Sequence, residues 1–532
     1  MRSLPTSFPY DPDTDFDLLR PEHPWRPVRI SVVMCLLAMT TIAYGMYAWG
    51  YGDLFSDAAQ ASFCWLYFGV TLVFVFNKVT RPRPHNWLSP DTVFWLVFTL
   101  FHIPYVVLYL IGWAEWDDRA FFSASAANRA ICCATLCGIG FLIGYELGAL
   151  GRAQGAPFVP TPRTPASLFQ ACQLLVFALF ALAALTLIIG MGPELVTYGY
   201  AAFMRGEVHG VAEETKRIVS LAVTLAEMGL ILYVAGALAT HGKIHKGVLI
   251  PVMIAGAILF FMLLGSRSRV ALLGLPLLCG YHYFVKSIKL WLGIPLFLGA
   301  MVLFAVIGVG RSAESLSPVD FYEAYTDYQQ KYGVHPLVMT LATTGTSIKT
   351  VNVACEFVPD REPYWYGLSV WDSVTMIVPS PFMGLRDRIV PSLWVTYMAT
   401  GRVGGRQSGW GSSMAMEAYI NFGLIGGACF TALIGFMMRR IYDSTLRRPT
   451  FVRICILLMS ISGMALWCRN YSHHFIRPVV WLSILAWFVW SLTGAARDAP
   501  GRDAPSESST LGAWPDGPDL RDGHEPSGTS GA

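Results

Sequence analysis

Charged residues are scarce in this chain of 532 residues: 14% are Asp, Glu, Lys or Arg, whereas 54% are hydrophobic. Soluble domains carry about a quarter of charged residues, so this composition excludes an ordinary soluble protein and indicates an integral membrane protein. The formal net charge of +3 is too small to suggest a nucleic-acid partner. The basic residues instead form short clusters beside apolar runs, as expected where they orient spans across a bilayer.

Several familiar motifs are also missing. No P-loop, dinucleotide-binding glycine motif, HExxH zinc motif or GxSxG nucleophile motif occurs in a usable context, which argues against soluble nucleotide or hydrolase chemistry. The eleven cysteines show neither metal-ligand spacing nor a disulfide framework, so we interpret them as packing residues. Residues 1–20 are polar and acidic and do not form a cleavable secretory signal. No internal repeat indicates a transporter.

Long apolar runs are what the chain does have. A helix needs about 20 apolar residues to cross the hydrocarbon core, because its backbone polar groups must be satisfied within the segment. Twelve runs meet this description, near residues 30–49, 59–76, 92–111, 128–150, 168–190, 218–239, 248–264, 270–285, 291–309, 422–438, 452–467 and 479–492. The sequence therefore predicts an all-α, polytopic membrane protein with about 12 transmembrane helices.

Lys and Arg collect after every second span, which fixes the predicted orientation. Arg29 precedes the first span, Lys78 follows the second and Arg439 follows the tenth. Because positive charge is retained on the cytoplasmic side, both termini are predicted to be cytoplasmic. The predicted parts are a cytoplasmic N-terminal segment 1–29, nine helices over 30–309, a large outer loop with short amphipathic helices over 310–421, three helices over 422–493, and a disordered cytoplasmic tail 494–532.

Five arginines break the orientation rule, because they lie in predicted outer loops: Arg267, Arg269, Arg311, Arg469 and Arg477. A guanidinium group offers a rigid fork that binds phosphate oxygens in a bidentate way and does not deprotonate. These residues therefore suit a lipid diphosphate, which they could bind and stabilise as a leaving group. The alternative is that they pair with loop carboxylates or contact lipid phosphates at the interface.

Four further side chains are candidates for proton transfer. Glu417 lies in SGWGSSMAMEAYINFGLIGG (408–427), on a short helix predicted to enter the membrane at the tenth span, where it could act as a general base toward a sugar hydroxyl. Its alternative role is a helix N-terminal charge stabilised by the helix dipole. His473 and His474 are the other candidates, unless they are ordinary polar contacts, and Asp372 is a weaker one.

Four stretches carry a resemblance to a known family. They are LLGSRSRVALL (263–273), YWYGLSVWDSVTMIVPSP (364–381), the stretch 408–427 quoted above, and RNYSHHFIRP (469–478). In style and order they resemble the Wzy-type O-antigen polymerases, the oligosaccharide repeat-unit polymerases of bacterial surface polysaccharide assembly. The resemblance implies a multi-spanning inner-membrane glycosyltransferase of the GT-C type with its active site, and hence the large loop, on the periplasmic side.

The resemblance also implies a reaction. A growing glycan on undecaprenyl diphosphate would be joined through its reducing end to the non-reducing sugar of the next lipid-linked repeat unit, giving O-antigen or exopolysaccharide without a metal or cofactor. Arg267, Arg269, Arg311 and Arg469 would face the diphosphate. Glu417 would be the acid-base or acceptor-positioning residue, although the resemblance does not decide between it and His474. The implied partners are membrane lipids, a chain-length regulator and a flippase.

Two other readings use the same lipid substrate. An O-antigen ligase would share the lipid donor and membrane plan but transfer the glycan to a lipid A core. A lipid-linked oligosaccharide flippase would not be an enzyme and should carry charged residues along several spans that line a cavity. Here charge concentrates in the loops, which argues against transport.

Overall fold

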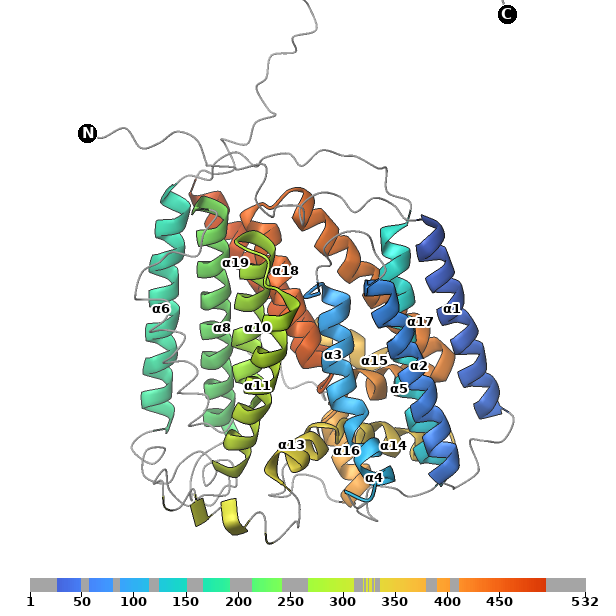
Figure 1. Ribbon diagram of the computed structural model, residues 1–532. Coiled ribbons are helices and arrows are strands. Elements are labelled where there is room, and N and C mark those ends of the chain that lie inside the picture. Colours follow the sequence, from blue (N-terminus) through green and yellow to red (C-terminus); the bar gives the residue numbers. More distant parts are fainter. Residues whose placement is uncertain are drawn as a thin grey trace, which may run out of the picture.

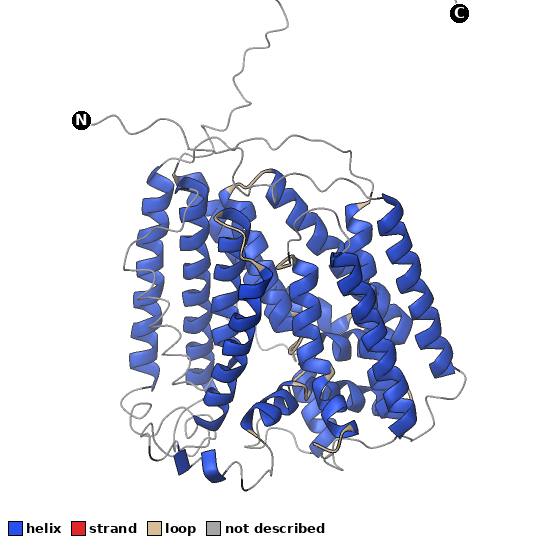
Figure 2. Ribbon diagram, in the orientation of Figure 1, coloured by secondary structure: helices blue, strands red, loops and turns tan. Residues whose placement is uncertain are grey.

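The computed structural model describes residues 26–48, 57–79, 87–113, 124–150, 166–191, 213–241, 267–310, 335–378, 390–401 and 411–493, together with isolated residues between 319 and 330. Every regular element in these ranges is a helix and none is a strand (Figure 2). The predicted all-α class is therefore confirmed. The predicted tail 494–532 lies outside the described residues.

Helices occupy the predicted apolar runs, apart from 248–264, which lies outside the described residues. They are α1 (Arg26–Met46), α2 (Asp57–Val79), α3 (Pro90–His102), α4 (Pro104–Leu110), α5 (Ala124–Ala149), α6 (Ala166–Met191), α8 (Glu213–His241), α10 (Arg267–Phe284), α11 (Leu290–Gly310), α17 (Met414–Arg447), α18 (Phe451–Trp467) and α19 (His473–Leu492). Among the described residues, five helices are long and apolar enough to cross a membrane, namely α1, α2, α5, α17 and α19. If α3 and α4 together form one span, the number of candidate spans is six. The two helices are bent by 44° where Pro104 interrupts the helix.

The closest helix pair consists of α5 and α17, which meet backbone to backbone through glycines. A Cβ added to Gly144 would lie 1.8 Å from a carbonyl oxygen of α17, and one added to Gly140 would lie 2.3 Å from another. In return, a Cβ on Gly435 would lie 2.1 Å from a carbonyl oxygen of α5. Such spacing of small residues lets transmembrane helices approach closely. In Figure 1 the pair lies on the right side of the bundle, where α1 and α2 pack on α5.

One end of the bundle carries the basic clusters. The Tyr283 hydroxyl at the end of α10 donates to the Leu88 carbonyl just before α3, and its ring packs against Tyr442 late in α17. Lys78 lies 2.6 Å from a carboxylate oxygen at the start of α3, and Arg439 is within 2.9 Å of another carboxylate in α17. We call this the basic end, defined by Lys78 and Arg439.

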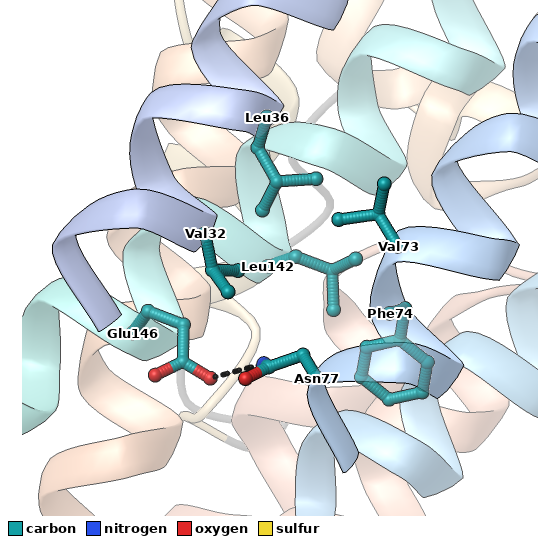
Figure 3. Close-up of a pocket in the computed structure, with 7 residues that line it drawn as sticks. All are labelled: Val32, Leu36, Val73, Phe74, Asn77, Leu142 and Glu146. Carbon is teal, nitrogen blue, oxygen red and sulfur yellow. Dashed lines mark hydrogen bonds between the residues drawn. The ribbon is translucent and has the colours of Figure 1, made fainter. Parts of the chain in front are cut away.

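An ion pair buried at the basic end joins α1, α2 and α5. The Arg29 guanidinium donates to Glu146 over 3.1 Å, and the Asn77 amide donates to the other carboxylate oxygen over 3.3 Å. Figure 3 shows Glu146 and Asn77 meeting at the edge of a small pocket whose other walls are apolar: Val32, Leu36, Val73, Phe74 and Leu142. An ionisable group inside a bilayer needs such partners, so we interpret Glu146 as a structural tie between three helices.

The opposite end is covered by short helices from the predicted large loop. They are α13 (Pro336–Thr344), α14 (Ser347–Phe357), α15 (Leu368–Thr375) and α16 (Pro391–Thr400). The Tyr419 hydroxyl near the start of α17 donates 2.8 Å to the Val358 carbonyl after α14, and the Lys349 ammonium lies 4.4 Å from the ring centre of Tyr105 in α4. We call this the cap end, defined by α13 to α16 (Figure 1).

At the cap end, α17 consists of two parts. Gly423 has φ +70° and ψ −166°, so residues 414–422 form a short helix before the apolar helix that continues to Arg447. Only glycine adopts this backbone conformation without strain. The predicted short helix that carries Glu417 is therefore present, directly before a helix long and apolar enough to cross a membrane.

Candidate functional site

Glu417 lies in the first turn of α17 and is completely buried, with 0% of its surface exposed. The helix begins here because the Ser413 hydroxyl accepts a hydrogen bond from the Met416 amide over 3.1 Å, which satisfies one of the free N–H groups at the helix start. An acidic residue in a first turn also matches the positive end of the helix dipole. Local sequence thus fixes where this carboxylate enters the fold.

Four donors surround the Glu417 carboxylate. Oε1 accepts from the Ser369 hydroxyl at 2.8 Å and from the Ser472 hydroxyl at 2.7 Å. Oε2 accepts from the Trp467 indole N–H and from the Ser472 backbone amide, both at 2.7 Å. These contacts join α15, the start of α17, the end of α18 and the turn before α19.

The same network continues on both sides of the carboxylate. Asn421, one turn further along α17, donates to the Ser369 hydroxyl and to the Glu417 carbonyl, each at 2.7 Å. On the other side, the hydroxyls of Ser472 and Ser373 are 2.8 Å apart. Buried polar groups that are fully satisfied in this way rigidify a structure. The network therefore holds α15 and the turn 468–472 in fixed positions.

This geometry limits what Glu417 can do chemically. Each carboxylate oxygen already has two donors, so neither is open to the proton of a substrate hydroxyl in this conformation. The donors are hydroxyl, indole and amide groups. Catalysis by Glu417 stays a prediction, and the hydrogen bonds offer a competing account in which the residue positions its neighbours.

The predicted histidines and two of the predicted arginines flank this network. His473 and His474 begin α19 directly after Ser472, and both rings pack on Tyr471, with ring centres 5.8 and 5.3 Å away. The Arg477 guanidinium lies 4.0 Å above the ring of a tryptophan one turn further along α19, and Arg469 lies 5.7 Å from the centre of an aromatic ring in α3. The turn 468–472 and the first turns of α19 thus gather two guanidinium groups and two imidazoles.

The remaining predicted arginines are placed only through the backbone. Arg267 and Arg269 lie at the start of α10, whose last turn packs at the basic end. Since a helix of 18 residues is about 27 Å long, α10 begins toward the cap end, where Glu417 lies. Arg311 lies outside the described residues, directly after Gly310, the last residue of α11. Because α11 packs on α13, this helix also ends at the cap end.

The family assignment follows from a comparison with known proteins. A family model described as O-antigen polysaccharide polymerase Wzy matches residues 30–493, from the first turns of α1 to the end of α19. The chain belongs to the Wzy family. The resemblance drawn from the sequence is thereby confirmed, together with the interpretation as a multi-pass membrane protein of polysaccharide biosynthesis. A comparison with curated proteins and another with solved structures found no match.

The cap end also contains Arg129, a mostly buried arginine that the sequence reasoning did not select. Arg129, near the start of α5, donates 3.2 Å to the Cys355 carbonyl in the last turn of α14 and lies 4.0 Å from the Asp360 carboxylate. A cation at a helix C-terminus stabilises the free carbonyls and the negative end of the dipole. The available signal was an arginine at the outer end of the predicted span 128–150, where the orientation rule disfavours positive charge.

Two cysteines near the Glu417 network and α14, Cys355 and Cys468, do not suit covalent chemistry. Burial raises the pKa of the Cys355 thiol well above its usual range, and burial likewise raises that of Cys468 in the turn before α19. Only the thiolate is a good nucleophile, so both are packing residues, as the sequence predicted. Within the ranges that the structure describes, no group of three or more His, Cys, Asp or Glu side chains is arranged to hold a metal ion.

Proposed function

We propose that this Wzy-family protein polymerises undecaprenyl-diphosphate-linked oligosaccharide repeat units into surface polysaccharide at the periplasmic face of the inner membrane. The proposed architecture has twelve transmembrane helices in a GT-C-like arrangement, with both termini in the cytoplasm and the cap end in the periplasm. Its partners would be membrane lipids, a chain-length regulator and a flippase. One observation carries the proposal: guanidinium and imidazole groups gather on the turn that Glu417 holds in place.

The proposed reaction transfers a glycan between two lipid carriers. The acceptor sugar hydroxyl forms a bond to the anomeric carbon of the donor glycan, and the bond from that carbon to the diphosphate breaks. The electron pair stays on the diphosphate, where the guanidinium groups of Arg469 and Arg477 neutralise the developing charge, assisted by Arg267, Arg269 and Arg311. Planar guanidinium forks suit this task because they bind two phosphate oxygens at once.

Glu417 supports this arrangement as a positioning residue. Its four hydrogen bonds fix the turn 468–472, and with it the direction in which Arg469 and the start of α19 face the membrane surface. A site held by such supporting hydrogen bonds keeps its charged groups in place before substrate binds, which is a condition for electrostatic catalysis. His473 and His474 lie next to the fixed turn, and we assign them to contact the sugar or the diphosphate.

The test is a gene deletion complemented with wild-type and variant proteins, followed by electrophoresis of the lipid-linked glycan. We expect the deletion to leave single repeat units and the wild-type gene to restore a polymer ladder. Arg469→Ala and Arg477→Ala should lose the ladder at normal protein abundance. Arg361→Ala, which removes an exposed arginine that pairs with Glu356 at the same end, is the matched control and should keep it.

Two results would contradict the proposal. Accumulation of uncapped lipid-linked polymer in the deletion strain would show that another protein polymerises and that this one is a ligase. Accumulation of single repeat units on the cytoplasmic side only would indicate a flippase.

A further inference from the structure

A second buried carboxylate lies beside the Glu417 network and differs from it in one respect. Asp372 in α15 is only 8% exposed, and its Oδ2 atom has no hydrogen-bond partner in the part of the chain that the structure describes. Its Oδ1 atom makes one long contact of 3.5 Å with the Thr375 hydroxyl, which also donates over 2.8 Å to the Asp372 carbonyl. The Asp372 Oδ2 atom is therefore buried and without a donor, whereas both oxygens of Glu417 have two donors each.

A buried carboxylate oxygen without a hydrogen-bond donor requires an explanation. Removing such a group from water without hydrogen-bond partners is costly, and nearly all buried polar atoms in folded proteins have partners. A purely structural role for Asp372 would need donors of the kind that surround Glu417. A group that must accept a proton from a substrate needs the reverse, a lone pair that the protein leaves unoccupied.

The orientation of α15 turns this carboxylate toward the site. The side chains on its outward face are apolar, with Leu368 51% and Trp371 61% exposed, while its inward face carries Ser369, Asp372 and Ser373. An apolar outward face is expected for a short helix that lies at the membrane interface. The polar inward face packs on α17 and α19, where Ser369 reaches Glu417.

Asp372 lies in the part of α15 that contacts the turn directly before the histidines. Ser373, the next residue, contacts the hydroxyl of Ser472, and His473 follows Ser472 in the chain. One turn beyond Asp372, the Ile377 carbonyl accepts a hydrogen bond of 2.8 Å from the indole of Trp481, on which Arg477 stacks. The chain segments that carry Asp372, the two histidines and Arg477 therefore meet where α15 packs on α19.

We propose that Asp372 is the general base of the reaction, an inference that rests on the proposed polymerase function. Oδ2 accepts the proton of the acceptor sugar hydroxyl as that oxygen bonds to the anomeric carbon of the donor. The electron pair of the broken glycosidic bond leaves with the diphosphate, so charge and atoms balance without a further reactant. Glu417 keeps α15 in position during this step through Ser369.

The experiment measures polymerisation of a lipid-linked repeat unit by the full-length protein in proteoliposomes, normalised to folded protein. Asp372→Asn keeps the size of the side chain but cannot accept the proton, so kcat should fall about 10²- to 10⁴-fold while KM changes little. Asp372→Glu retains a carboxylate and should recover part of the rate. Asp360→Asn removes a carboxylate that is 72% exposed at the same end and is the control expected to match wild type.

The outcomes separate this inference from the function on which it rests. If wild-type protein makes no polymer from the lipid-linked unit, the proposed function fails. If wild type polymerises and Asp372→Asn does so at a similar kcat, Asp372 is not the base, and His473→Ala and His474→Ala become the decisive variants. An equal loss in Asp372→Asn and Asp372→Glu, with a raised KM in both, would show that Asp372 only shapes the site.

Discussion

Replacing Glu417 with glutamine tests whether this residue positions the site or performs the chemistry. The amide group of glutamine can hold its NH₂ on either side. If the NH₂ group replaced Oε2, it would face the Trp467 and Ser472 N–H groups, which are donors that cannot rotate away. If the NH₂ group replaced Oε1, it would face the hydroxyls of Ser369 and Ser472, which can rotate and accept its hydrogen bonds. We therefore expect the glutamine to adopt the second orientation.

The expected loss of stability follows from the four hydrogen bonds. A hydrogen bond to a charged group contributes about 1.5–3 kcal/mol and a neutral one about 0.5–1.5 kcal/mol, so each bond weakens by about 1 kcal/mol. Because a neutral side chain is less costly to bury, the net decrease in the free energy of unfolding should be about 2–3 kcal/mol. Glu417→Ala leaves two fixed N–H donors without acceptors at about 1–3 kcal/mol each and also opens a cavity, so it should be clearly worse.

The assay combines thermal unfolding of purified protein in detergent with polymerisation per folded molecule. For a positioning residue, Glu417→Gln lowers the midpoint of unfolding and reduces the rate by less than about tenfold, since a lost general base typically costs 10²- to 10⁴-fold. A Glu417→Gln protein as stable as wild type with a rate at least 10²-fold lower would refute this reasoning. That result would make Glu417 the base, as the sequence suggested.

Three further predictions address packing, charge and topology. Gly144→Leu should prevent accumulation of folded protein, because its side chain would collide with a backbone carbonyl of α17. Gly299→Ala should accumulate normally, because a Cβ there meets no atom within 4 Å. Immunoblotting of membranes measures both amounts. Arg477→Lys should not restore the polymer lost in Arg477→Ala, because lysine keeps the charge but loses the planar fork that stacks on the indole. A normal polymer ladder in Arg477→Lys would show that only the positive charge of this residue is needed. In a variant without reactive cysteines, a cysteine at Asp360 should react with an impermeant reagent added outside the inner membrane and one at Arg448 should not, and the reverse pattern would invert the orientation.

The helices could be predicted because the bilayer permits few alternatives. A span must satisfy its backbone internally, so every span is a long apolar helix that hydropathy reveals. How these helices pack against one another is harder to predict from the sequence. The approach of α5 and α17 depends on Gly140 and Gly144, whose four-residue spacing was legible in the sequence, and on Gly435, whose matching place on α17 was not.

The candidate site was only partly predictable. The sequence reasoning selected Glu417 and the stretch 469–478 separately, and the structure brings Glu417 and the turn 468–472 into contact. The sequence did not reveal that serines and a tryptophan, 48 to 55 residues from Glu417 along the chain, would donate hydrogen bonds to its carboxylate. Serine and tryptophan occur throughout this chain, and no periodicity relates a loop helix to a turn between two spans. Long-range polar contacts of this kind are set by tertiary packing alone.

The contrast between Glu417 and Asp372 shows why residue type is a weak guide to catalytic role. Both are carboxylates on short helical segments with serine neighbours, and the sequence ranked Glu417 first because it lies in the more distinctive motif. The structure surrounds Glu417 with donors that hold it in place, whereas Oδ2 of Asp372 has no donor among the described residues. A carboxylate that holds helices together needs every lone pair occupied, whereas a base needs one available. Hydrogen-bond occupancy is therefore the physical criterion that separates the two roles, and it favours Asp372 as the base.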